Sequence, residues 1–469
     1  MKNHKFHPHI LRKYDIRGTI GETLSENDAY YIGLSYSTIL LKNEINGRVV
    51  IGYDGRISSP SLRNFLIKGI NESGISVVDI GLCATPELYF ATKHLENIAG
   101  GIMITGSHNP SNQNGFKIVM DGKPFFDLDI LKLSDIATSG SFLVNTNDIN
   151  SELLTYQNIS KSYINMLVKM HPEIKNLKVI WDPGNGAVGA HLNDLVGSLT
   201  GEHKTINIEV DGTFPNHHPN PSDHKNLNQL IETVLDTNSD LGIAFDGDGD
   251  RLGVVDSKGH IITGDALLLI MAKDVLSRHP KSKIIADVKT SDIVFQEIKK
   301  MGGDPIIWKT GHSFIKTKMK EESAILAGEM SGHIFFSENY YGFDDAIMAA
   351  VKLLSILSKD KNAINDALSC FKDVYSTPEL SIECSESEKF KIIDIIKNHL
   401  NTKGISFLDI DGVRVQEKDS WWLIRASNTE AKLILRIESR DKEKLSELLY
   451  HIKKLLSDAG VNKSALNFL

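Results

Sequence analysis

The amino-acid sequence predicts three similar mixed-sheet α/β domains followed by a smaller α+β domain. Two observations lead to this prediction. The 469 residues, 41% hydrophobic and 24% charged, are enough for about three domains, or four if some are small. Helix and strand signals alternate along most of the chain, which favours largely parallel sheets covered by helices, and the pattern changes in the last part. We predict domains at residues 1–155, 156–260, 261–372 and 373–469.

The first domain shows the alternation most clearly. Ser25 and Asp28 form a capping-box pattern that opens a predicted helix through Leu41. Thr85 is expected to cap a later helix, with Pro86 in its first turn. The apolar segment 101–105 then predicts a buried strand.

The three α/β domains share a second feature, a short apolar strand that runs into a small, polar loop. The strands are predicted at 102–105, 242–245 and 324–327. Ligands of α/β sheets bind beyond the carboxyl ends of the strands. We therefore expect the three loops to lie at a binding site.

The last domain has a different pattern. A helix is predicted at 390–400, strands at 407–410, 421–426 and 433–437, and a final amphipathic helix that ends near Gly460. This order indicates an α+β domain that carries one loop toward the others.

Composition excludes several classes of protein. The net charge is −8 and no long run of Lys or Arg occurs, so a nucleic-acid partner is not expected. No secretory signal or apolar stretch of membrane-spanning length is visible, and the three widely spaced cysteines are typical of a reducing compartment. We expect a cytoplasmic protein without a membrane partner. The oligomeric state stays open, with a monomer favoured.

The segment 246–251, Asp-Gly-Asp-Gly-Asp-Arg, is the most specific local pattern. Alternating carboxylates in a glycine-bearing loop can converge on one hard cation such as Mg²⁺. An EF-hand loop would need Gly at its sixth position and Glu at its twelfth, where this chain has Arg251 and Ser257. A solvated acidic turn is the remaining alternative.

Three further loops carry polar side chains that could bind a ligand. Segment 105–110, Thr-Gly-Ser-His-Asn-Pro, presents a serine between small residues, and 328–333, Gly-Glu-Met-Ser-Gly-His, offers groups that hydrogen-bond sugar hydroxyls. Segment 425–430, Arg-Ala-Ser-Asn-Thr-Glu, can surround a phosphate. Each loop, taken alone, is also compatible with an ordinary polar turn.

A dinucleotide-binding alternative rests on segment 184–189, which matches GxGxxG, follows a predicted strand and has Glu209 about twenty residues further on. The motif is weak by itself, and Asp182-Pro183 before it makes the entry turn unusual. We favour structural glycines at a strand-to-helix turn.

In combination, the four loops resemble the alpha-D-phosphohexomutase family, and most closely its phosphomannomutase/phosphoglucomutase branch. The motifs TGSHNP, DGDGDR, GEMSGH and RASNTE occur in this order from residue 105 to residue 430, so the resemblance covers essentially the whole chain. It implies four domains around a central cleft.

The resemblance also implies roles for particular residues. Ser107 corresponds to the phosphoserine and, with Asp246, Asp248 and Asp250, to the Mg²⁺ ligands. Glu329 and Ser331 correspond to sugar contacts, and Arg425, Ser427, Asn428 and Thr429 to phosphate contacts. Further positions resemble catalytic residues (Arg17, His108, Lys117, Arg251, His312) or substrate contacts (Tyr14, Lys289, His333).

The implied reaction interconverts hexose 1-phosphate and hexose 6-phosphate, of mannose or glucose, through a hexose 1,6-bisphosphate that reorients in the cleft. Lys117 or a nearby histidine would accept the proton of the attacking hydroxyl. Phosphoglucosamine mutase is the alternative within the family, although its sugar loop typically has Gln where this chain has Met330. A nicotinamide oxidoreductase and a non-catalytic sugar-phosphate binding protein are the alternatives outside it.

Overall fold

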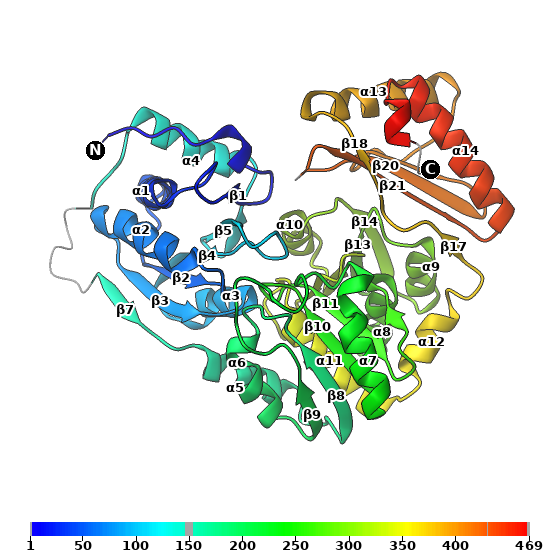
Figure 1. The fold of residues 1–469 in the computed structure, drawn as a ribbon, viewed down its shortest axis with the longest axis horizontal. Helices are drawn as coiled ribbons and strands as arrows, with labels where there is room; N and C mark the ends of the chain where they lie inside the picture. The colour runs from blue at the N-terminus through cyan, green and yellow to red at the C-terminus, as the bar shows by residue number, and fades with distance from the viewer. Residues whose placement is uncertain (1, 146–152, 429, 467–469) are drawn as a thin grey trace.

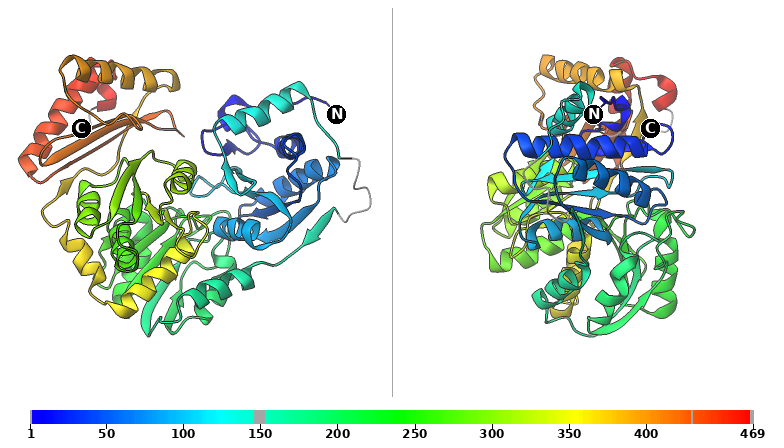
Figure 2. Two further views of the ribbon diagram at one scale, coloured as in Figure 1. Left: turned by 180° about the vertical axis from the view of Figure 1, so that it is seen from behind. Right: turned by 90° about the vertical axis from the view of Figure 1, so that its left-hand side faces the viewer.

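The computed structural model describes residues 2–145, 153–428 and 430–466. Four sheets follow one another along the chain, and the units that they form are arranged in an arc (Figure 1). The first and fourth units lie at the two ends of the arc, as the left view of Figure 2 also shows. No helix in the described part of the chain is both long enough and apolar enough to cross a membrane.

The first unit has a seven-stranded mixed sheet in the order β1-β5-β4-β2-β3-β7, with β6 paired to β5. Strands β2, β3, β4 and β7 are parallel, whereas β1, β5 and β6 are antiparallel to their neighbours. Its elements are η1 (Pro8–Ile10), β1 (Ile16–Thr19), α1 (Glu26–Lys42), β2 (Arg48–Tyr53), α2 (Ser59–Glu72), β3 (Val77–Leu82), α3 (Thr85–His94), β4 (Ile98–Ile104), β5 (Gln113–Met120), β6 (Lys123–Phe125), α4 (Leu128–Ser139) and β7 (Leu154–Tyr156).

Local signals set the ends of two of these helices. The capping box of Ser25 and Asp28 opens α1 as predicted. At α3 the cap differs from the prediction, because Ala84 is the N-cap residue and Thr85 is the first helical residue. The carboxylate of Glu87 accepts a hydrogen bond from the Ala84 amide, which leaves the Thr85 hydroxyl available for a partner in the second unit.

The second and third units repeat a smaller mixed sheet, in the orders β12-β11-β10-β8-β9 and β14-β13-β15-β16. The second comprises α5 (Ser160–Met170), β8 (Leu177–Asp182), α6 (Gly189–Gly197), β9 (Gly201–Thr205), η2 (His224–Leu227), α7 (Asn228–Thr237), β10 (Leu241–Phe245), β11 (Leu252–Asp256) and β12 (Ile261–Ile262). The third comprises α8 (Gly264–Arg278), β13 (Lys283–Asp287), α9 (Asp292–Lys300), β14 (Asp304–Trp308), α10 (His312–Glu322), β15 (Leu326–Gly328), β16 (Ile334–Phe336), α11 (Ala346–Lys359) and α12 (Ala363–Ser369).

The fourth unit is a five-stranded sheet, β17-β21-β20-β19 with β18 on β21, and all its pairs are antiparallel. Its elements are β17 (Tyr375–Ser376), β18 (Leu380–Glu383), α13 (Glu386–Thr402), β19 (Val413–Gln416), β20 (Ser420–Ala426), β21 (Lys432–Ser439), α14 (Lys442–Asp458) and η3 (Lys463–Leu466). The strand predicted at 407–410 is wrong. There the chain makes a single bridge between Leu408 and Arg414, since Asp409, Asp411 and Gly412 form a turn instead.

The cores show how the units are joined. One large apolar cluster is shared by residues of the first three units, among them Val50, Trp181 and Leu267. The fourth unit has its own core and meets the third through a small cluster of Val288, Trp421 and Leu423. The first three units are thus packed together more extensively than the fourth is packed against them.

Candidate active site

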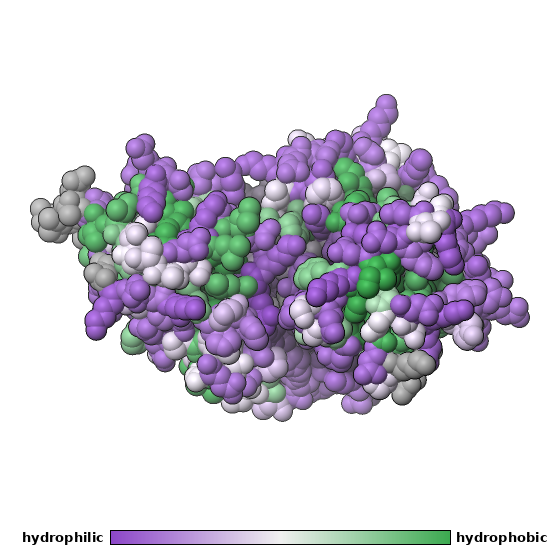
Figure 3. Space-filling view, turned by 90° about the horizontal axis from the view of Figure 1, so that it is seen from above, coloured by the Kyte–Doolittle hydropathy of each residue, from purple (hydrophilic) through white to green (hydrophobic). Residues whose placement is uncertain are grey.

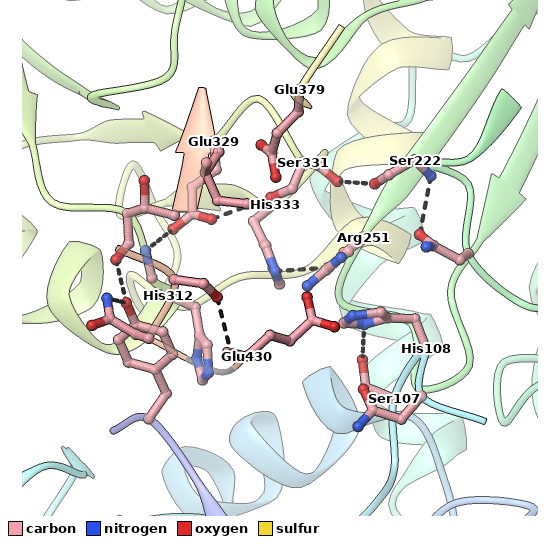
Figure 4. A pocket seen from close by; sticks show the side chains of 18 of the residues that line it. Ser107, His108, Ser222, Arg251, His312, Glu329, Ser331, His333, Glu379 and Glu430 are labelled. Atoms are coloured by element: carbon pink, nitrogen blue, oxygen red, sulfur yellow. Dashed lines mark hydrogen bonds between the residues drawn. The ribbon is translucent and has the colours of Figure 1, made fainter. Parts of the chain in front are cut away.

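A large cavity of about 1520 Å³ lies between the four units, and loops from all of them line it. Seen from above, hydrophilic residues surround the hollow in the middle of this face (Figure 3). Figure 4 shows labelled side chains of the first, second, third and fourth units around this space. The central cleft that the resemblance implied is therefore present, and the four motif loops meet in it.

Ser107 lies in the loop between β4 and β5, on a residue with an unusual backbone. Its φ of 48° is in the left-handed region, which a non-glycine residue adopts only where the surroundings hold it. The Ser107 amide donates to Thr105 Oγ1 at 2.8 Å. The side chain is nearly buried, and its Oγ donates to Asp246 Oδ2 at 2.8 Å and lies 3.1 Å from His108 Nδ1. The serine loop thus meets the second unit directly.

The aspartate loop follows β10. Asp246 Oδ1 accepts the backbone amides of Asp250 and Arg251 at 3.0 and 3.2 Å, so the first carboxylate shapes its own loop. Asp246, Asp248 and Asp250 are buried, and their ligand atoms lie within 4.8 Å of one another. Burial, followed by the charges of Asp250 and Asp248, raises the pKa of Asp246. Such a cluster needs positive charge beside it.

Cations from the first unit supply part of that charge. Lys117, on β5, donates through Nζ to Asp248 Oδ2 at 2.6 Å and to Asp250 Oδ2. Thr85 Oγ1 donates to Asp248 Oδ2 at 2.6 Å. Arg17, on β1, donates to the Gly106 carbonyl at 2.5 Å and pairs with Asp15.

The aspartate loop also fits a divalent cation. Asp248 Oδ1 and Asp250 Oδ1 are buried atoms with no hydrogen-bond partner among the described residues, and unpaired buried carboxylate oxygens are costly. Oxygen donors of this kind are the ligands that Mg²⁺ prefers. The donor set therefore matches a hard cation next to Ser107.

The sugar loop joins β15 to β16 and is held in part by α10. Glu329 Oε1 accepts from the Gly311 amide at 2.8 Å, and Ser331 Oγ donates to Glu329 Oε2 at 3.2 Å. His333 Nε2 accepts from Arg251 Nε at 3.0 Å, which links this loop to the aspartate loop (Figure 4). Burial raises the pKa of Glu329.

His312, the first residue of α10, also lines the cavity. Its Nδ1 lies 3.7 Å from Asp344 Oδ2. Burial, together with the positive charge of Lys316, holds the pKa of His312 well below its usual range. The imidazole is therefore neutral near pH 7.

The phosphate loop lies between β20 and β21. Arg425 Nε donates to Asp411 Oδ2 at 2.9 Å, and Asn428 Nδ2 donates to the hydroxyl of Tyr14. The same hydroxyl donates to the Thr310 carbonyl at 2.8 Å, so Tyr14 connects the first, third and fourth units. Ser427 lines the cavity as well. Thr429 lies outside the described residues.

Lys289 faces the cavity from the loop after β13 and is paired with Glu379 at 2.7 Å. Sequence reasoning did not find Glu379, nor Arg56, Lys389 and the cavity-lining residues His218, Asn220 and Ser222. Arg56 binds the serine loop from behind, and Lys389 Nζ donates to the carbonyls of Ser427 and Glu430 at 2.7 and 3.0 Å.

The GxGxxG segment supports the aspartate loop. Gly184 has a φ of 55°, and a Cβ on Gly186 would lie 2.9 Å from the Gly247 carbonyl oxygen. The Ala187 amide donates to that carbonyl at 2.9 Å. These glycines permit a close backbone approach, in agreement with the structural interpretation of the motif.

A serine held against a carboxylate cluster, in a polar cavity lined by four units, is a site of the phosphoryl-transfer class. Family models described as phosphoglucomutase/phosphomannomutase alpha/beta/alpha domains I, II and III and C-terminal domain match residues 8–143, 161–259, 263–374 and 379–454. The chain belongs to this phosphoglucomutase/phosphomannomutase family.

Individual relatives support membership of the same family. A phosphomannomutase/phosphoglucomutase of Pseudomonas syringae pv. tomato is 42% identical over 456 residues, 96% of each chain, and one of Pseudomonas aeruginosa PAO1 is 43% identical over 442 residues, 94% of this chain and 93% of the relative. A crystal structure of a family protein from Burkholderia thailandensis has a TM-score of 0.89 at 35% identity, covering 97% of this chain and 99% of that one.

These findings confirm the predicted family, the fold class and the enzyme class. The chain is a hexose-phosphate mutase. The phosphoglucosamine mutase alternative is not favoured, because these relatives are named for phosphomannomutase and phosphoglucomutase activities.

Proposed function

We propose that this enzyme interconverts the 1- and 6-phosphates of mannose or glucose through a phosphorylated Ser107 and a hexose 1,6-bisphosphate. The observation that carries the proposal is the 2.8 Å hydrogen bond from Ser107 Oγ to Asp246 Oδ2. It joins a nucleophilic oxygen to a carboxylate cluster from another unit. The names of the relatives supply the two hexoses.

Asp246, Asp248 and Asp250 would hold Mg²⁺ together with an oxygen on Ser107. When bound, the ion would neutralise charge on the phosphoryl group during transfer. Lys117 adds positive charge beside Asp248 and Asp250. Arg17 adds it at the serine loop, and Arg251 does so from the end of the aspartate loop. Catalysis of this kind rests on positioning and on stabilising spread negative charge.

In the first half of the reaction a free hydroxyl oxygen of the sugar phosphate forms a bond to phosphorus while the bond from phosphorus to Ser107 Oγ breaks, and the net proton transfer runs from the sugar hydroxyl to the serine oxygen. In the second half Ser107 Oγ forms a bond to the other phosphorus of the bisphosphate while the bond from that phosphorus to the sugar oxygen breaks, and the proton returns from the serine hydroxyl to the sugar oxygen. His108 Nδ1 lies 3.1 Å from that oxygen, and Lys117 and His312 also line the cavity. The base is one of these three groups.

The remaining predicted residues would bind the sugar phosphate. Glu329 and Ser331 would contact sugar hydroxyls, with Lys289 and His333 beside them. Tyr14, Arg425, Ser427, Asn428 and Thr429 would contact the phosphate that is not transferred. The cavity of about 1520 Å³ leaves room for the bisphosphate to turn, so that one sugar loop and one phosphate loop serve both orientations.

We place this activity in the cytoplasm, on a monomer that needs only small-molecule phosphosugars and Mg²⁺. The three cysteines are free thiols, which suits a reducing compartment.

The test is intact-mass analysis before and after incubation with glucose 1,6-bisphosphate. The wild-type protein should gain one phosphoryl group, and Ser107→Ala should gain none and lose turnover by roughly four orders of magnitude or more, as when an enzyme loses its nucleophile. Ser111→Ala, at an exposed serine close by in the same loop, is the matched control and should behave as wild type. An active Ser107→Ala protein would refute the phosphoserine route.

The hexose is tested separately by comparing mannose, glucose and glucosamine 1-phosphates. We expect kcat/KM to be highest for mannose or glucose 1-phosphate. A preference for glucosamine 1-phosphate would contradict that assignment.

A further inference from the structure

Arg56 binds the serine loop with four of the five N–H groups of its guanidinium, and the fifth binds Asp54. Nη1 donates to the carbonyls of Pro110 and Gln113 at 2.5 and 2.8 Å, and Nη2 donates to the carbonyls of Ser107 and Asn109 at 2.8 and 2.6 Å. Nε donates to Asp54 Oδ2 at 3.2 Å. Five donors thus meet five acceptors, which is the full capacity of an arginine side chain.

Arg56 acts from outside the cavity. The Arg56 residue is 1% exposed, and it is not among the described residues that line the cavity. A Cβ on Gly106 would lie 2.3 Å from Arg56 Cζ, so the loop backbone rests directly on the guanidinium. Arg56 therefore cannot contact the sugar phosphate, and any effect that it has on the reaction must pass through the loop.

Asp54 completes this support. Its Oδ2 also accepts the Gly106 amide at 3.0 Å, and its Oδ1 accepts the Arg56 amide at 3.1 Å and the Ser59 hydroxyl at 2.6 Å. The charge of Arg56 is balanced by one carboxylate, and both ends of the pair are tied to the loop. The ring of Phe214, from the second unit, lies 5.2 Å from the guanidinium, where the two units meet.

These contacts explain how Ser107 keeps its backbone conformation. A φ of 48° is unfavourable for serine, and the carbonyls of Ser107 and Asn109 would be costly if buried without donors. Arg56 supplies those donors and holds the carbonyl oxygens against its own positive charge. Because these two carbonyl oxygens are bound to Arg56, they do not face a phosphoryl group on Ser107. The negative charge of such a group would repel them.

We propose that Arg56 is a positioning residue for phosphoryl transfer, which fixes Ser107 Oγ against the aspartate cluster. The inference rests on the proposed role of Ser107 as phosphoryl carrier. A lysine cannot replace this arginine, because its three donors radiate from one atom and cannot reach carbonyls on both sides of a planar fork.

The test measures phosphorylation of Ser107 by glucose 1,6-bisphosphate in single turnovers, together with steady-state kcat and KM for glucose 1-phosphate. Arg56→Lys should slow phosphorylation by about 10²-fold, the effect of misplacing a reacting group by about 1 Å, with KM within about twofold of wild type. Arg48→Lys is the matched control, because that arginine binds the Glu96 carbonyl at an exposed site away from the loop, and it should match wild type.

A folded Arg56→Lys protein that is phosphorylated at the wild-type rate overturns the inference, as does a loss that appears equally in KM. If Arg56→Lys does not fold, Asp54→Asn is the variant that tests the inference. That variant should slow phosphorylation at constant KM, and an unchanged rate would overturn the inference. A wild-type protein that is never phosphorylated would instead refute the proposed function, so the two failures can be told apart.

Discussion

The serine loop and the phosphate loop are held in different ways. The serine loop is fixed from several sides: Arg17 and Arg56 bind its carbonyls, and Asp246 accepts from Ser107 itself. The phosphate loop is anchored by Lys389, on a helix of its own unit. It reaches the first unit through the contact of Asn428 with Tyr14.

This difference matches what the two loops must do in the proposed reaction. The phosphoryl donor has to keep one position against the aspartates in both half-reactions. The phosphate loop must release and rebind a bisphosphate that turns between them, and its unit shares only a small apolar cluster with the third. Damage to the serine side should therefore lower kcat, whereas damage to the anchor of the phosphate loop should raise KM.

The largest effect is expected from Asp248→Asn. The change removes a negative charge from the aspartate cluster and weakens the contact with Lys117. We expect kcat to fall by roughly 10²- to 10³-fold and the Mg²⁺ concentration needed for half-maximal activity to rise. Initial rates across a Mg²⁺ titration measure both. Asp240→Asn, at the exposed residue before β10, is the control; an unaltered Mg²⁺ requirement in Asp248→Asn would remove this residue from the metal site.

A rise in KM, rather than a fall in kcat, is expected from Lys389→Met. The substitution removes the donor to the carbonyls of Ser427 and Glu430 and leaves Glu386, which is half exposed, without its partner. Losing charge-assisted hydrogen bonds should raise KM about tenfold with little change in kcat. Lys391→Met, at an exposed position of the same helix, should leave both constants unchanged. If Lys389→Met lowered kcat and left KM unchanged, the proposed difference between the serine loop and the phosphate loop would be contradicted.

The smallest effect is expected from Thr85→Val, which keeps the shape of the side chain and removes its hydrogen bond to Asp248. Because other donors still hold this carboxylate, loss of the hydrogen bond should lower kcat by about fivefold, which corresponds to about 1 kcal/mol, the net contribution of an ordinary hydrogen bond. The control is Thr92→Val on the same helix, where the hydroxyl binds the Tyr89 carbonyl. Steady-state kcat and KM of the two variants measure the difference. A change in KM without a change in kcat would show that Thr85 does not support the aspartate loop.

Much of the fold and the composition of the cavity could be predicted because each motif loop follows a short apolar strand in the sequence. The loops at 107, 246 and 329 could be expected at a binding site because ligands of α/β sheets bind beyond the carboxyl ends of the strands. The loop at 425 belongs to an antiparallel sheet, and its place beside the others was implied by the family resemblance. The residue roles remain predictions that the experiments above test.

The supporting side chains could not be predicted in the same way. Arg56 is 51 residues from Ser107 in the chain, and Lys389 is 38 residues from Ser427, so no local pattern joins them to their loops. The Lys289–Glu379 pair crosses from the third unit to the fourth. At 407–410 apolar residues suggested a strand, but the turn through Asp409 and Gly412 prevents it.

The most direct test of the account places a paramagnetic ion beside the serine. The phosphorylated protein is titrated with Mn²⁺ in place of Mg²⁺, and the ³¹P resonance of the phosphoserine is recorded. If the phosphoryl group and the aspartates share one ion, one equivalent of Mn²⁺ should broaden that resonance beyond detection in wild type and should do so much less in Asp248→Asn. A resonance that stays sharp while Mn²⁺ is bound would contradict the account.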